Sequence, residues 1–257
     1  MRQRLAAVVL AALLLLAGCG EDGDERVATN GRTATEATTT ETAPTTTAPE
    51  PFPATTPGRV LTAFVRAAAA DDLQAMWELL SVPSQRRLGP ALEVFRAGAG
   101  RNLATELGRF VRGRSRVFLE EPITGTFAVA AYGGRTAVGN RRPFASYAVA
   151  LRLEDGGWRI ELDGPVEIRP LGPDPGETQR GPFQLAAGVR ANAPVVEGGL
   201  WLDGQAVPGR TAGSRPSEVT MFSDSQGRIP AGPHAVVAFA ATFADASALA
   251  WNFVYQR

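Results

Sequence analysis

The sequence predicts an α+β fold in which a layer of helices and an antiparallel sheet come before an all-β sandwich. Between residues 57 and 111, apolar side chains recur at helical spacing. After Gly113 the period changes to two, which is typical of strands that bury one face. From residue 183 onward, short strand-like runs alternate with turn residues at regular spacing, and this pattern favours a sandwich.

The composition excludes several classes of chemistry. Of the 257 residues, 44% are hydrophobic and 20% are charged, which are the proportions of a globular protein. All 26 basic residues are arginine, so a P-loop, a Schiff-base lysine and a Ser-x-x-Lys acyl enzyme are excluded. The single cysteine excludes an internal disulfide and a thiolate metal cluster, and we expect no cofactor.

Residues 1–18 have the pattern of an export signal. Two arginines precede an apolar run from Leu5 to Leu16, which is shorter than a comfortable membrane span. Leu16-Ala17-Gly18-Cys19 resembles the lipobox of bacterial lipoproteins. The resemblance implies cleavage before Cys19, which would carry diacylglycerol; two or more acyl chains anchor a protein stably. An ordinary signal peptide with a chance cysteine is the alternative.

Residues 19–56 are expected to form a lipidated tether. This Thr/Pro-rich segment contains few apolar residues and seven acidic residues between positions 20 and 56. Such a composition cannot bury enough surface to fold. We therefore expect it to hold the folded part of the chain away from the membrane.

Residues 57–169 are expected to form the first folded domain. Helices are predicted from Pro57, from Asp71 or Asp72 as a cap, and over residues 90–111. Strands are predicted in the segments 115–121, 125–132, 135–139, 143–154 and 158–168. The turn at Asp155-Gly156-Gly157 between the last two is a strong hairpin signal.

The order of these elements resembles the NTF2-like superfamily, which includes SnoaL-like and cystatin-related domains. The segments "FVRAAAADDLQAMWELLS" and "ALRLEDGGWRIELDG" carry the resemblance. It implies a cone in which a curved antiparallel sheet wraps around helices. It implies the fold more than an activity, because the superfamily includes enzymes, binding modules and spacers.

A Pro/Gly-rich linker, residues 170–182, is expected before a second domain at 183–257. The segments "LWLDGQAVP", "RIPAGPHAVVAFA" and "WNFVY" resemble, in this order, the strands of bacterial Ig-like domains. The resemblance implies an Ig-like β-sandwich and gives His234 a structural role at the start of a strand. A metal site at His234 is disfavoured because the chain has no second histidine.

Two groups of residues are candidate binding sites. If the cone is partly open, aromatic and hydroxyl side chains could line a mostly apolar cavity; the alternative is that they fill the core. These residues are Trp77, Ser81, Tyr132 and Tyr147. An arginine cluster at the change from helix to strand could contact an anionic surface; the alternative is a solvated face beside a helix dipole. Its members are Arg109, Arg112, Arg114 and Arg116.

The sequence therefore predicts a lipid-anchored protein on the extracytoplasmic face of the cell membrane that acts as a non-enzymatic binding or adaptor module in the envelope. The expected partners are the membrane, through Cys19, and an envelope protein, a wall polymer or a small apolar ligand; nucleic acid is not expected. The alternative is a lipid or small-molecule carrier, or an isomerase or cyclase that uses the cone. Such an enzyme needs an inward carboxylate, for which Glu120 or Glu121 is the candidate.

Overall fold

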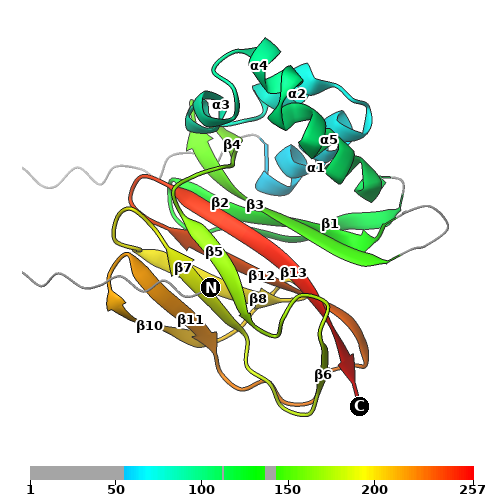
Figure 1. The fold of residues 1–257 in the computed structure, drawn as a ribbon, viewed down its shortest axis with the longest axis vertical. Helices are drawn as coiled ribbons and strands as arrows, with labels where there is room; N and C mark the ends of the chain where they lie inside the picture. The colour runs from blue at the N-terminus through cyan, green and yellow to red at the C-terminus, as the bar shows by residue number, and fades with distance from the viewer. Residues whose placement is uncertain (1–54, 112, 137–142) are drawn as a thin grey trace, which may run out of the picture. The chain divides into compact units, whose positions relative to one another are not determined.

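The computed structural model describes residues 55–111, 113–136 and 143–257 (Figure 1). The predicted signal peptide, the tether with Cys19, Arg112 and most of the predicted strand 135–139 lie outside the described residues. The helices come first in the chain: α1 (Pro57–Ala69), α2 (Leu73–Glu78), α3 (Val82–Leu88), α4 (Leu92–Ala97) and α5 (Ala99–Val111). None of the described helices is long and apolar enough to cross a membrane.

The helices begin where the sequence supplies caps. The Thr56 hydroxyl accepts a hydrogen bond from the Arg59 N–H at the start of α1, and Pro57 occupies the first turn. Asp72 caps α2 by accepting from the Ala75 N–H at 3.0 Å. Helix α3 was not predicted from the sequence; Ser81 caps it by accepting from the Ser84 N–H.

The first sheet is antiparallel and has the order β1 (Arg114–Pro122), β2 (Phe127–Arg135), β3 (Phe144–Glu154) and β4 (Gly157–Glu161). The predicted turn between β3 and β4 forms with positive φ angles at Asp155 and Gly156. The face of β3 that carries Val149 and Leu151 packs on the helices, together with Trp158 and Ile160 of β4. We call this core the helix-side cluster; its largest buried side chains include Phe64, Phe95, Phe110, Met76 and Leu107.

The rest of the chain forms two further sheets. One has the order β10 (Gly209–Arg215), β11 (Glu218–Ser223), β7 (Ala186–Arg190) and β5 (Glu167–Gly172). The other has the order β6 (Thr178–Arg180), β13 (Ala246–Gln256), β12 (Gly232–Ala241), β8 (Glu197–Leu202) and β9 (Gln205–Ala206). Between them lies the sandwich cluster, which includes Leu185, Val236, Trp251, Phe253 and Tyr255.

Strands β5 and β6 lie at the expected linker. β5 begins at Glu167, within the predicted first domain, but it pairs with β7 of the sandwich. β6 lies inside the predicted linker and pairs in parallel with the end of β13. The segment 167–180 therefore contributes strands to both sheets of the sandwich rather than only separating two domains.

A third core joins the first sheet to the β12–β13 sheet. We call it the shared cluster; it includes Leu119, Phe127 and Val129 of the first half and Trp201, Val237 and Phe239 of the second. Alternate β12 residues enter different cores, because Val236 and Ala238 belong to the sandwich cluster, whereas Val237 and Phe239 belong to the shared cluster. The β12–β13 sheet is therefore buried on both faces.

The described residues have a mixed α+β architecture, with helices on one face of the first sheet and two sheets beyond its other face (Figure 1). All of them belong to one compact unit, residues 50–257. Independent folding of 57–169 and 183–257 stays a prediction.

Candidate functional site

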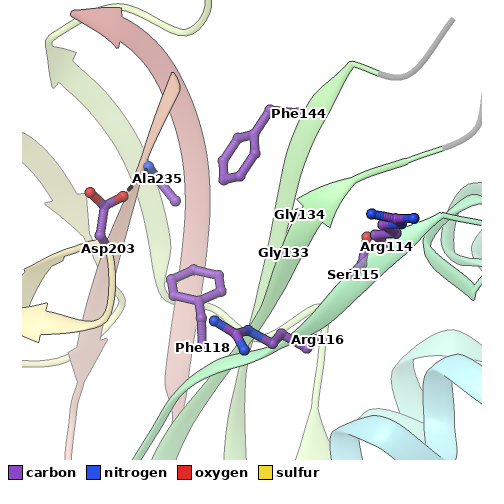
Figure 2. A pocket seen from close by; sticks show the side chains of 9 residues that line it. All are labelled: Arg114, Ser115, Arg116, Phe118, Gly133, Gly134, Phe144, Asp203 and Ala235. Carbon is purple, nitrogen blue, oxygen red and sulfur yellow. Dashed lines mark hydrogen bonds between the residues drawn. The ribbon is translucent and has the colours of Figure 1, made fainter. Parts of the chain in front are cut away.

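An open groove of about 620 Å³ lies between the first sheet and the turn from β8 to β9. We call it the arginine groove. The first sheet supplies Arg114, Ser115, Arg116, Phe118, Gly133, Gly134 and Phe144, the turn after β8 supplies Asp203, and β12 supplies Ala235 (Figure 2). Its volume is in the range of small-molecule sites, but it is open rather than enclosed.

A β-bulge gives Phe118 its position at the groove. The register between β1 and β2 shifts between Val117 and Leu119, so Phe118 is the extra residue. Gly133 leaves space for the ring, because a β-carbon there would lie 2.8 Å from Phe118 Cε1. Gly204, at a φ of +86°, brings the β8–β9 turn against Phe118, where a β-carbon would overlap the carbonyl oxygen of that residue.

Phe144 provides a second aromatic ring in the groove. It begins β3, pairs with Arg135 on β2, and is half-buried. Phe118 packs against the shared cluster, but Phe144 belongs to none of the three clusters that the described residues form. Figure 2 shows the Phe144 ring extending from the start of β3 into the open space of the groove.

Arg114 and Arg116 give the groove its positive charge. They are two residues apart on β1, so both side chains lie on the sheet face opposite the helices, and both are exposed. Among the described residues, neither forms an ion pair. Two guanidinium groups beside two aromatic rings make a surface that suits an anion with an apolar face.

Contacts between Asp203, His234 and Ala235 form the opposite wall of the groove. One Asp203 oxygen accepts from the Ala235 N–H at 2.9 Å, and the other lies 2.6 Å from His234 Nδ1. His234 Nε2 lies 2.8 Å from the Pro230 carbonyl oxygen, and the ring stacks on Phe253. Both ring nitrogens of His234 therefore lie within hydrogen-bonding distance of an oxygen atom. His234 is thus occupied in structural contacts.

The predicted cavity residues pack at or beside the helix-side cluster instead of lining the arginine groove. Trp77 is half-buried and donates from Nε1 to the Gly89 carbonyl at 3.3 Å. Tyr132 and Tyr147 both pack on Phe110, with ring centroids 6.0 and 6.4 Å away. Burial, and secondarily the charge of Glu106, raise the pKa of the Tyr147 hydroxyl above its ordinary value.

Ser81, the fourth predicted cavity residue, joins a buried ionic cluster that the sequence analysis did not predict. Its hydroxyl donates to Glu161 at 2.7 Å, and Arg152 Nε donates to the same carboxylate at 2.9 Å. Arg87 pairs with the other Glu161 oxygen and also reaches Asp245 at 3.2 Å. Glu161 pairs with Ala150, which belongs to the shared cluster, so the β12–β13 sheet covers this face of β4 and buries the carboxylate.

The predicted arginine cluster divides between two environments. Arg114 and Arg116 line the groove, whereas Arg109 lies in the last turn of α5, pairs with Glu106 at 3.5 Å and lies over the Phe110 ring. Arg112 lies outside the described residues. Of the two candidate inward carboxylates, Glu120 is exposed and Glu121 accepts from Trp201 Nε1 at 2.8 Å.

Sequence reasoning missed Phe118, Phe144 and Asp203 as groove residues. The available signals were the aromatic residue in an arginine-rich strand and the Asp203-Gly204 turn, but neither shows which strands meet in space. No group of three or more His, Cys, Asp or Glu residues in the described ranges could hold a metal ion. A scan against protein-family models and a search of curated proteins each find no match to this chain.

Proposed function

We propose that this protein is a lipid-anchored, extracytoplasmic binding module that holds an anionic component of the cell envelope in the arginine groove. One observation carries the proposal: two arginines and two aromatic rings line the same open groove. They are Arg114, Arg116, Phe118 and Phe144. In this proposal, the acyl chains on Cys19 that the lipobox resemblance implies form the anchor, and residues 19–56 form the tether.

The same proposal assigns an NTF2-like cone to the first half of the chain and an Ig-like sandwich to the second. Helices on one face of a four-stranded antiparallel sheet support the first assignment. Two packed sheets with the strand-opening His234 support the second. In this proposal the two folds act together, because each contributes one wall of the groove.

A binding role is favoured over catalysis by how the buried titratable groups are used. Glu161 accepts from Ser81, Arg87 and Arg152, so both of its oxygens are engaged within the protein. His234 faces acceptors with both ring nitrogens. Groups held in this way are used in contacts that stabilise the fold.

The binding proposal is tested with the full chain in detergent and immobilised dextran sulfate. Near an anionic surface each arginine contributes about 1 kcal/mol, so Arg114→Gln with Arg116→Gln should weaken binding about 30-fold. The matched control is Arg210→Gln with Arg215→Gln, which removes the same charge from the exposed strand β10. Equal weakening by both pairs would show that net charge, rather than the groove, drives binding.

The anchor is tested separately. Cys19→Ala should abolish metabolic labelling with palmitate and release the protein from the membrane fraction, because the acyl chains supply the membrane affinity. Unchanged labelling and unchanged partition together would contradict the proposed lipidation at Cys19.

A further inference from the structure

Resting on the proposed function, we infer that the anionic component is a polysaccharide chain. The apolar faces of its sugar rings stack on Phe144 and Phe118, and its acid groups pair with Arg114 and Arg116. The inference names the chemistry of the ligand: a flat, hydrated polymer with an acidic group on its repeating unit.

The aromatic rings are the first reason. Phe144 is half-buried in the groove and is absent from the three clusters of the described residues, so its ring does not serve as core packing. Phe118 is held at the groove by a bulge and two glycines. An aromatic ring has a negative face, which attracts the weakly positive C–H groups on the apolar face of a sugar.

The spacing of the arginines is the second reason. Two residues along a strand place Arg114 and Arg116 about 6.6 Å apart at the backbone, which is comparable with the length of one sugar residue. Guanidinium groups bind carboxylates and phosphates through paired hydrogen bonds. Successive acid groups of a polymer can therefore each meet one arginine.

The openness of the groove is the third reason. An acyl chain gains its binding free energy by leaving water, and so it needs an enclosed apolar cavity. This groove is open, and Gly133 and Gly134 on β2 contribute no side chains to it. A hydrated polymer can enter such a groove from the side and continue beyond both ends. On the opposite wall, contacts to His234 and Ala235 engage both oxygens of Asp203.

The test uses the full chain in detergent with four soluble probes. The probes are tetragalacturonate, the neutral galactotetraose, sodium sulfate, and dihexanoyl phosphatidylglycerol below its micelle concentration. We expect tetragalacturonate to bind more tightly than the other three. Phe144→Leu should weaken its binding about tenfold, the scale of losing an aromatic anchor at an interface. Phe144→Tyr keeps the ring and should retain binding.

Phe243→Leu is the matched control. Phe243 lies on the turn between β12 and β13, is 87% exposed and does not line the groove, so its replacement should leave binding unchanged. Thermal unfolding of each variant shows whether the fold is retained. If Phe144→Leu unfolds the protein, two comparisons still test the polysaccharide inference. One compares Phe144→Tyr with the wild type, and the other compares tetragalacturonate with galactotetraose.

The outcomes separate the two proposals. If tetragalacturonate binds in an arginine-dependent manner but Phe144→Leu has no effect, or if the phospholipid or sulfate binds as tightly, the polysaccharide inference is overturned and the anionic groove stands. If none of the anionic probes binds and dextran sulfate does not bind either, the proposed function itself fails. Loss of binding in Phe243→Leu would place the site elsewhere.

Discussion

Phe239→Ala should destabilise both halves of the protein, because its side chain belongs to the shared cluster. Phe239 lies two residues before the end of β12 and is fully buried. Its cross-strand neighbours are Gly199 on β8 and Ala248 on β13, which are too small to fill the space that the ring would leave. Truncation of a buried phenylalanine costs about 3–5 kcal/mol, and poor collapse of the cavity favours the upper part of that range.

The expected loss is large relative to the stability of a typical protein, about 5–15 kcal/mol. Urea unfolding of the full chain measures the total loss. Hydrogen exchange followed by mass spectrometry then reports on separate segments, with peptides from α1 and α5 for the helical layer and from β7 and β11 for the sandwich. If the shared cluster couples the halves, protection decreases in both sets of peptides.

The control is Phe243→Ala on the exposed turn beyond β12, which should change stability by less than about 0.5 kcal/mol. A decrease in protection confined to β7 and β11, with α1 and α5 unchanged, would refute the reasoning. That result would mean that the regions 57–169 and 183–257 unfold independently, as the sequence predicted for separate domains.

Two further predictions concern the Glu161 carboxylate and the Tyr147 hydroxyl. Glu161→Gln should cost about 3 kcal/mol in urea unfolding, because it leaves Arg87 and Arg152 beside a neutral amide; a cost below about 1 kcal/mol would show that the ionic cluster is not maintained in solution. The raised pKa of Tyr147 means that the folded state holds this proton more tightly than the unfolded state, so its contribution is complete below the ordinary pKa of 10.0 and declines as the pH rises above it. Tyr147→Phe should therefore reduce the loss of stability between pH 9 and about 12, and an unchanged loss would contradict this assignment.

Local patterns predicted the elements whose structure depends on nearby residues. The caps at Thr56 and Asp72 lie within three residues of the N–H groups that they accept from, so the sequence indicates where α1 and α2 begin. The Asp155-Gly156 turn forms because these residues adopt positive φ at low cost, and it fixes the pairing of β3 with β4. The period of two after Gly113 likewise predicted strands in the segments that form β3 and β4.

The ionic cluster and the arginine groove could not be predicted in this way, because both depend on contacts between segments that are distant in the sequence. Glu161 contacts Ser81 and Arg87, which lie 80 and 74 residues earlier in the sequence. Asp245, on the turn after β12, completes the ionic cluster through its contact with Arg87. No local pattern joins these positions. The groove is similar, because Phe144 and Asp203 meet only when the first sheet packs on the β12–β13 sheet. One signal was present: the continuous apolar run 235–241 is typical of a strand that is buried on both faces.

The position of the groove links ligand binding to the packing of the first sheet on the β12–β13 sheet. Residues 114–118 and 144 come from the first sheet, whereas Asp203 and Ala235 come from the sheet on the other side of the shared cluster. A ligand that contacts both walls binds only when the shared cluster is formed. It therefore stabilises that packing by an amount that grows with the ratio of its concentration to its dissociation constant.

The small residues that line much of this interface, among them Ala131, Ala148 and Ala241, let the sheets approach closely but contribute little apolar area each. A bridging ligand is thus expected to protect α1 and β11 from hydrogen exchange together, whereas a ligand held by Arg114 and Arg116 alone would protect mainly the first sheet.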